Sequence, residues 1–109
     1  MAKYMIQFSY TQEGVRGLLT EGGTNRRKAT EELVRSLGGR LEAYYYTFGE
    51  YDGVAIIDKM DNVEAAAAAM TAAASGAVKT MTTVLLEPDE IDRVARKTPT
   101  YRPPGASFQ

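Results

Sequence analysis

The chain has 109 residues, with 13 Lys and Arg against 14 Asp and Glu, and it contains no Cys, His or Trp. This length suits one domain with a single hydrophobic core. The lack of Cys and His excludes disulfides, Ser-His-Asp triads, and thiolate or imidazole sites for zinc, haem or copper. The net charge of −1 also argues against non-specific nucleic-acid binding, which needs an excess of positive charge.

The chain shows no targeting signal or membrane span. Residues 1–8 alternate in polarity too soon to supply the unbroken apolar stretch of a secretory signal. No run approaches the roughly 18 apolar residues that a spanning helix needs. We therefore expect a soluble, bacterial-type cytoplasmic protein with no membrane partner.

The first third of the chain predicts a strand followed by two helical segments. Apolar side chains recur at every second position over residues 4–10, which is the period of a strand with one apolar face. Residues 11–13 offer an N-cap and an acid for a short helix that a Gly-Gly pair interrupts. The next helix carries an apolar stripe over residues 29–37, and Thr24 or Asn25 is expected to cap it.

The middle of the chain predicts a β-hairpin. Residues 41–48 are rich in aromatic side chains, and residues 51–59 contain a run of apolar, mostly branched ones. Residues 49–53 carry the Gly and Asp typical of turns, so the two strands are expected to pair as neighbours.

The last third predicts a helix, a strand and a second helix. Asp61 followed by Glu64 has the spacing of a capping box, and the alanine-rich stretch after it is a strong helix former. Residues 78–86 alternate like a strand. A final helix is expected over residues 88–97, with its apolar side chains facing inward. Those apolar side chains are Ile91 and Val94.

This order of elements predicts an α+β fold, the ferredoxin-like βαββαβ two-layer sandwich with a C-terminal helix. Right-handed crossovers place the first and third strands in the centre of the sheet and the helices on one face. We expect residues 1–97 to form the domain. Residues 98–109 contain three of the four prolines and are expected to form an extended C-terminal tail.

The sheet is expected to carry apolar side chains on both faces. In the third strand, Val54 and Ile56 point to one side and Ala55 to the other. In the second strand, one face carries Leu41, Ala43 and Tyr45 and the other carries Tyr44, Tyr46 and Phe48. In the last strand, one face carries Met81 and Leu85 and the other carries Val84 and Leu86. Because the helices cover only one face, an apolar surface is left open.

An open apolar face predicts self-association. About ten side chains that each leave about 60 Å² exposed would form a patch as large as the roughly 300–600 Å² that is the maximum on typical monomers. Packing of two such faces across a two-fold axis would cover both patches. We therefore expect a homodimer joined through the sheet, a dimeric α/β barrel, or a larger homo-oligomer built from such dimers.

Several segments together resemble the GYD domain family, which is named for a Gly-Tyr-Asp signature. The signature residues in this chain are Gly49, Tyr51 and Asp52. Supporting matches occur at residues 10–14, 37–39, 75–77 and 101–105. The resemblance implies a dimeric α/β-barrel-like fold and carries no established biochemical role.

The turn at residues 49–53 has two interpretations. As a catalytic site, Asp52 would act as a general base beside Tyr51 and Glu50, with the phenol orienting or protonating a substrate. As a structural element, the Gly supplies positive φ, the Asp accepts backbone N–H bonds and the Tyr packs over the turn. Turn chemistry alone accounts for these residue types.

Two further clusters could bind ligands. Tyr44, Tyr46 and Phe48, with Glu50, could line a pocket for a small apolar molecule, or they could be ordinary core and interface residues. The cations at the start of the second helix could bind an anion at free backbone N–H groups, although no P-loop motif is present and a neighbouring Glu could offset them. The residues of this cluster are Thr24, Arg26, Arg27 and Lys28.

The sequence thus predicts a small homo-oligomeric binding or assembly module of unknown biochemical role, which could hold a small apolar ligand between sheet and helices. The alternative is a cofactor-independent enzyme, oxygenase- or isomerase-like, that uses Asp52 and tyrosines. A regulatory domain that senses an anion at residues 24–28 is a third hypothesis. No cofactor is expected, and the carboxylates lack the spacing of an EF-hand metal site.

Overall fold

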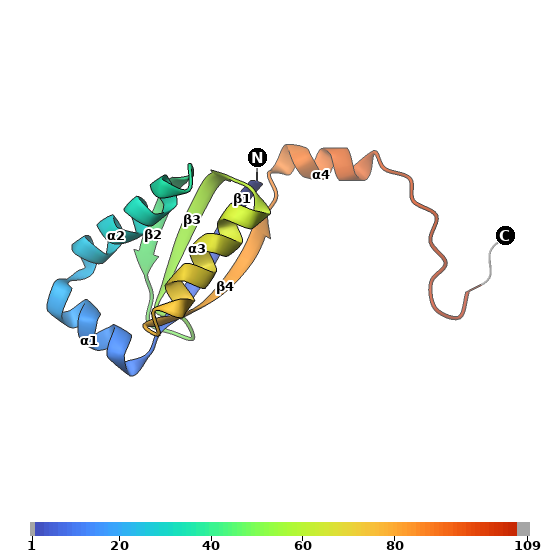
Figure 1. Cartoon of the computed structure of the whole chain (residues 1–109). Helices are drawn as coiled ribbons and strands as arrows, with labels where there is room; N and C mark the ends of the chain where they lie inside the picture. The colour runs from blue at the N-terminus through green and yellow to red at the C-terminus, as the bar shows by residue number, and fades with distance from the viewer. Residues whose placement is uncertain (1, 107–109) are drawn as a thin grey trace.

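The computed structural model describes residues 2–106 and shows one antiparallel sheet with the strand order β2-β3-β1-β4. The elements in chain order are β1 (Ala2–Tyr10), α1 (Gln12–Glu21), α2 (Gly23–Ser36), β2 (Arg40–Tyr46), β3 (Gly53–Met60), α3 (Asn62–Ala74), β4 (Val78–Leu85) and α4 (Pro88–Ala95). Helices α1, α2 and α3 lie on one side of the sheet (Figure 1). The predicted ferredoxin-like α+β sandwich, with β1 and β3 central, is confirmed.

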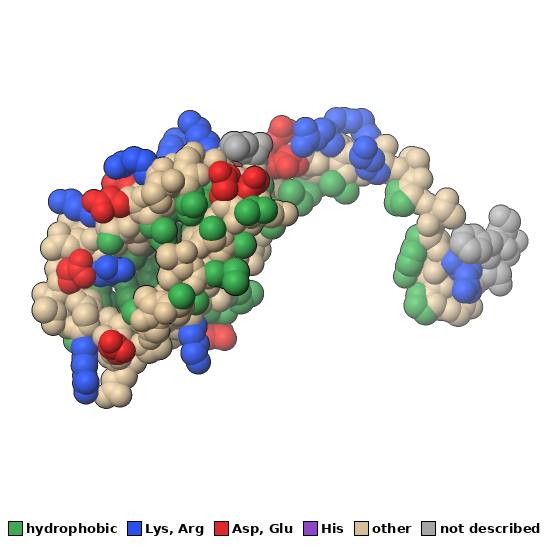
Figure 2. All heavy atoms as spheres, viewed as in Figure 1, with side chains coloured by type: hydrophobic (Ala, Val, Ile, Leu, Met, Phe, Trp, Pro, Cys, Tyr) green, Lys and Arg blue, Asp and Glu red, His purple; other side chains and the backbone are tan. Residues whose placement is uncertain are grey.

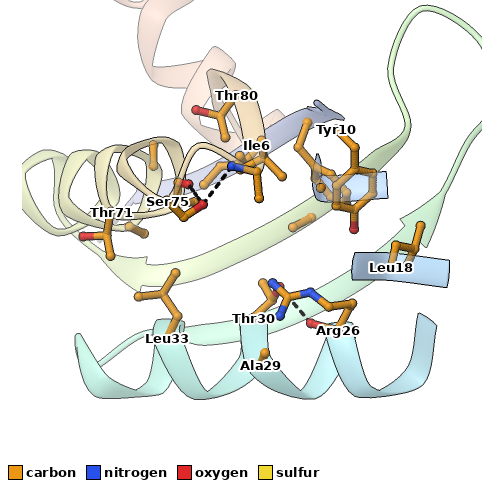
Figure 3. A pocket seen from close by; sticks show the side chains of 18 of the residues that line it. Ile6, Tyr10, Leu18, Arg26, Ala29, Thr30, Leu33, Thr71, Ser75 and Thr80 are labelled. Atoms are coloured by element: carbon orange, nitrogen blue, oxygen red, sulfur yellow. Dashed lines mark hydrogen bonds between the residues drawn. The ribbon is translucent and has the colours of Figure 1, made fainter. Parts of the chain in front are cut away.

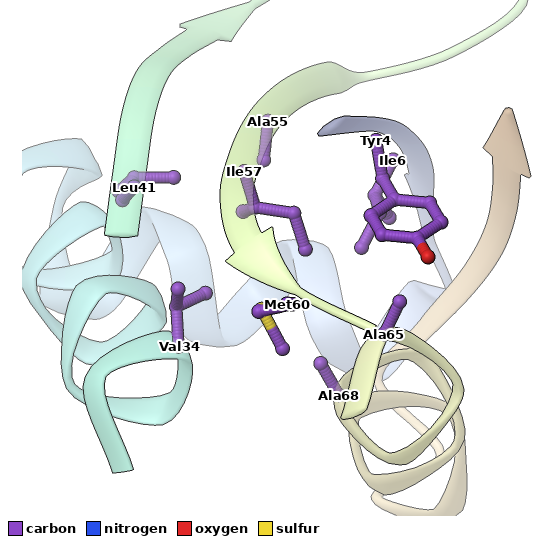
Figure 4. Close-up of a cluster of buried hydrophobic side chains, with 9 residues drawn as sticks. All are labelled: Tyr4, Ile6, Val34, Leu41, Ala55, Ile57, Met60, Ala65 and Ala68. Atoms are coloured by element: carbon purple, nitrogen blue, oxygen red, sulfur yellow. The ribbon is translucent and has the colours of Figure 1, made fainter. Parts of the chain in front are cut away.

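The core lies between the sheet and the helices α2 and α3. Tyr4 and Ile6 on β1 pair with Ile57 and Ala55 on β3, and all four side chains are buried on the helix side of the sheet. Helix α3 meets them through alanines, whose small side chains let its backbone come close to the sheet. Figure 4 shows this cluster, which is completed by Val34, Leu41, Met60, Ala65 and Ala68.

Two of the predicted helix starts are confirmed by their caps. The Thr11 hydroxyl accepts the Gly14 N–H at 3.1 Å and caps α1. At α3, the Asp61 carboxylate accepts the Glu64 N–H at 2.8 Å, and the Glu64 carboxylate accepts the Asp61 N–H at 2.9 Å. This reciprocal pair is the capping box that the spacing predicts.

The predicted cap of α2 is wrong. Helix α2 begins at Gly23 and its N-cap is Gly22, which turns the chain with φ of 91° directly after α1 ends. Glycine adopts this backbone conformation without strain, so a single residue separates the two helices. Thr24 and Asn25 consequently lie inside the first turn of α2, and the Asn25 amide donates to the Glu21 carbonyl at 3.1 Å.

A bulge in β2 changes the side to which one residue points. The pairing of β2 with β3 shifts register between Leu41 and Ala43. Leu41 is therefore buried in the same core as the side chain of Tyr44, and the expectation that Leu41 opposes Tyr44 is wrong. The extra residue of a bulge shifts the alternation of side chains by one position. Leu41 and Tyr44, which would otherwise point to opposite faces, therefore point to the same one.

Helix α4 leaves the body of the protein, and it does not bury its apolar side chains as expected. Ile91 is 49% exposed and Val94 is 57% exposed. The helix follows the edge strand β4 and projects away from the sheet, with hydrophobic atoms along one side and charged atoms along the other (Figures 1 and 2). Together with the segment that follows it, α4 gives the described chain dimensions of 64 × 30 × 22 Å.

Beyond α4 the described chain forms no further helix or strand. A turn closes at residues 103–106, where the Ala106 N–H donates to the Pro103 carbonyl at 3.0 Å. Four positions lie outside the described residues. They are Met1 of the predicted domain and residues 107–109 of the predicted tail.

The side of the sheet opposite the helices, here called the open face, has an apolar centre, as predicted. Met5 pairs with Ile56, and Gln7 pairs with both Val54 and Met81, so these side chains share one surface. The apolar side chains of the open face are Met5, Ala43, Tyr45, Val54, Ile56, Met81 and Leu85. No described element covers them (Figure 1).

Candidate functional site

A cavity of about 510 Å³ lies between the sheet and the helices α1, α2 and α3. The hollow is visible between α2 and α3, with hydrophobic atoms inside it (Figure 2). Two features of the sequence leave this volume open: α3 presents only small side chains to it, and α1 contributes Gly17, beside which a Cβ would meet no atom within 4 Å. The volume falls in the range of pockets that bind drug-sized molecules.

The walls of the cavity are mainly apolar. Ile6, Phe8 and Ala55 of the sheet line it from one side, and Leu18 of α1 and Leu33 of α2 line it from the helices. Figure 3 shows side chains from the sheet, α2 and α3 directed into the shared space. Such a lining suits a ligand whose body is apolar.

An aromatic cluster closes one end of the cavity. The Phe8 ring lies 5.6 Å from Tyr10, 5.5 Å from Tyr44 and 6.5 Å from Tyr46, measured between ring centroids. Tyr10 and Tyr44 line the cavity, and the Tyr46 hydroxyl donates to the Gly23 carbonyl at 2.9 Å. The cluster therefore joins β1 and β2 to the start of α2.

Burial raises the pKa of Tyr10 to about 12, with a further contribution from the neighbouring Tyr44 hydroxyl. Burial and the same neighbour also raise the pKa of Tyr46. Both phenols consequently stay protonated near neutral pH and can donate hydrogen bonds.

The raised pKa of Tyr10 predicts a loss of stability at alkaline pH. The folded protein holds this proton more tightly than the unfolded chain, in which the pKa is 10.0. The contribution of the Tyr10 hydroxyl to the free energy of unfolding is thus fully present below pH 10 and is lost as the pH rises to about 12. Titration of tyrosinate absorbance should show a step near pH 12 that is absent in Tyr10→Phe and in denaturant. Titration of Tyr10 at the pKa of the unfolded chain would contradict the burial of its hydroxyl.

One cation enters the cavity lining. Arg26, on the first turns of α2, lies beside Thr30 and forms an ion pair with Glu21 in which Nη1 is 3.5 Å from Oε2. Arg27 instead pairs with Glu31 at 3.8 Å along the outside of the helix. Among the described residues, the structure brings Arg26 together with Tyr10 and Tyr44 in the lining. Thr24, Arg27 and Lys28 lie outside it.

The hairpin residue Asp52 is bound to the end of β1. Its carboxylate Oδ2 accepts the Tyr10 N–H at 2.7 Å, and its own N–H donates to the Phe8 carbonyl at 2.8 Å. The Tyr51 hydroxyl contacts Met81 Sδ at 2.9 Å on the open face. These bonds hold the β2–β3 turn against β1. The predicted catalytic roles of Asp52 and Tyr51 stay predictions.

The other residues predicted for ligand binding are separated by the fold. Phe48 is fully exposed at the tip of the hairpin, and the Glu50 carbonyl accepts the Ser9 hydroxyl at 3.5 Å. Neither residue belongs to the cavity lining, whereas Tyr44 does. Within residues 2–106 no three carboxylates gather to hold a metal ion. Among the helices of the same residues, none has the length and hydrophobicity of a membrane span.

The family model of the GYD domain matches residues 4–95 of the chain. The chain belongs to the GYD domain family. A relative from Thermus thermophilus, named "Glutamine synthetase and cystathionine beta-lyase binding protein", is 30% identical over 82 residues. That alignment covers 75% of this chain and 85% of the relative. No solved structure matches the chain.

Part of the cavity of this GYD domain could be found from the sequence. Tyr44 and Arg26 were each predicted to bind ligands, but in separate sites. Tyr10 and Leu18 were assigned only to a strand and a helix, although both line the cavity. The available signal was Gly17, because a helix position without a side chain leaves space above the sheet.

Proposed function

We propose that this GYD domain is a homo-oligomeric binding module that docks onto partner enzymes. The observation that carries the proposal is α4, whose side chains Ile91 and Val94 are about half exposed on a helix that projects from the body. A helix of 8 residues gains little stability by itself, so a partner that covers its apolar side would stabilise it. Apolar side chains along one side of such a helix suit insertion into a groove.

The relative from Thermus thermophilus supports this direction, since it is named as a binding protein for glutamine synthetase and cystathionine beta-lyase. We take glutamine synthetase as the first partner to test and cystathionine beta-lyase as the second. The open face serves a different contact in this proposal, the pairing of two copies of the chain. Each dimer would then present two α4 helices to its partners.

The test measures binding of the purified chain to each purified enzyme of the same organism by biolayer interferometry. We expect a dissociation constant in the micromolar range or below for at least one of them. Replacing Ile91 and Val94 by serine should weaken this binding by about tenfold or more, since truncated apolar anchors carry much of an interface energy. The control is Val63→Ser, which removes an apolar side chain that is 76% exposed on α3. No binding of either enzyme at high micromolar concentration would contradict the proposal.

The cavity supports a second part of the proposed function, the binding of a small and mainly apolar molecule. Its volume of about 510 Å³ and its aliphatic and aromatic lining support the binding of such a molecule. The cofactor-independent enzyme stays the alternative prediction. We favour binding because Asp52, the candidate base, accepts the Tyr10 N–H and lies outside the cavity lining.

A further inference from the structure

We propose that the cavity binds an apolar, ring-containing molecule with a single anionic oxygen group, such as an aromatic monocarboxylate, and that Arg26 and Tyr10 recognise this group. The inference rests on the small-ligand part of the proposed function and adds the chemical class and the orientation of the ligand.

The apolar part of the ligand is defined by the inner walls. Phe8 and Tyr44, with ring centroids 5.5 Å apart, offer aromatic surface at one end. Alanines 68, 69 and 72 of α3 present methyl groups along one side. Flat or compact rings can contact both surfaces in the space between sheet and helices, and they bring little conformational entropy to lose on binding.

The polar group of the ligand is defined by two donors from different elements. In Figure 3 the Tyr10 hydroxyl points from the sheet side toward α2, and the Arg26 side chain extends from α2 into the same space. A guanidinium is always charged and presents up to five N–H donors in a geometry that matches a carboxylate. Within the described residues, a single ion pair, 3.5 Å long and partly exposed, occupies Arg26. It can therefore bind a ligand oxygen beside Glu21.

The other charges in the lining disfavour a ligand with two negative charges. Glu13 and Glu21, both on α1, are the carboxylates that line the cavity among the described residues, and Arg26 is the cation. A dianion such as a phosphate monoester would meet two carboxylates with one guanidinium to compensate it. A monoanion meets less repulsion from these carboxylates, so the charge count favours a carboxylate over a phosphate monoester.

The test uses two fluorescent probes with the same aromatic body. 8-Anilinonaphthalene-1-sulfonate carries a monoanionic group that stands for the carboxylate, and N-phenyl-1-naphthylamine lacks it. We expect both to bind the full chain. Arg26→Gln should weaken binding of the sulfonate by about tenfold or more and should change binding of the neutral probe by less than about twofold. The matched control is Arg27→Gln, one residue along α2 and outside the lining, which should change neither affinity.

A second pair of variants locates both probes. Ala69→Phe fills the cavity and should remove binding of both, whereas Met70→Phe adds the ring at a position that is 70% exposed on the same helix and should leave both affinities unchanged. Equal sulfonate affinity in Arg26→Gln and the unmodified chain would overturn the recognition of the anion. Probe binding that survives Ala69→Phe would overturn the cavity as the site. If neither probe binds, the small-ligand part of the proposed function fails, while enzyme docking through α4 is tested separately.

Discussion

Gly14→Ala is expected to lower the free energy of unfolding by about 3 kcal/mol or more and the melting temperature by more than about 10 °C. A Cβ at this position would lie 2.0 Å from the Ala77 carbonyl oxygen and 2.9 Å from its carbon. That carbonyl is fixed because it accepts the Thr11 N–H at 2.9 Å. Backbone atoms on both sides must therefore shift, and the bond that joins α1 to the start of β4 weakens. Thermal and chemical denaturation followed by circular dichroism would measure the loss.

The control for this change lies one turn away in the same helix. A Cβ on Gly17 would meet no atom within 4 Å. Gly17→Ala should raise the stability by up to about 1 kcal/mol, because alanine favours the helix and nothing opposes it. Equal effects at the two positions would show that the close approach of α1 to Ala77 is absent in solution.

Ile56→Lys is expected to convert the proposed dimer into a monomer at micromolar concentration. Ile56 lies at the centre of the open face, paired with Met5 on β1 and with Ala43 on β2. A two-fold axis would bring two lysines into one apolar interface, where each ammonium loses water and finds no partner. We expect the dissociation constant of the dimer to rise at least about 100-fold. Sedimentation equilibrium over a range of concentrations would measure it.

The matched control adds the same charge away from the sheet. Val63→Lys changes an apolar side chain of α3 that is 76% exposed, so the dimer should persist. Far-ultraviolet circular dichroism should show that both variants keep the fold. A chain that is monomeric without any substitution at micromolar concentration, or a dimer that tolerates Ile56→Lys, would contradict pairing through the open face.

The order of the elements could be predicted because the signals that define them are local. Alternation along residues 4–10 identifies β1, and the spacing of Asp61 and Glu64 identifies the start of α3. The apolar character of both faces of β3 follows from one run, in which Val54 and Ile56 oppose Ala55 and Ile57. Each of these inferences needs only neighbouring residues and the geometry of a single element.

The features that the sequence did not predict depend on contacts between distant segments. The bulge after Leu41 appears only when β2 is aligned with β3, and the start of α2 depends on how closely it follows α1. Ile91 and Val94 have the pattern of a buried helix face, but the chain provides no described surface to cover them. The cavity unites residues from all four strands and three helices, so no single segment carries its signature.

Tyr10 links two parts of the molecule that would otherwise be separate. Its amide is held by the Asp52 carboxylate of the family's signature hairpin, and its ring forms part of the cavity wall. A ligand that contacts this ring therefore contacts a residue whose backbone N–H is hydrogen-bonded to Asp52 Oδ2 at 2.7 Å. Hydrogen–deuterium exchange at the Tyr10 amide would consequently report on cavity occupancy. By the same contact, a change in the hairpin would shift the Tyr10 ring in the cavity wall.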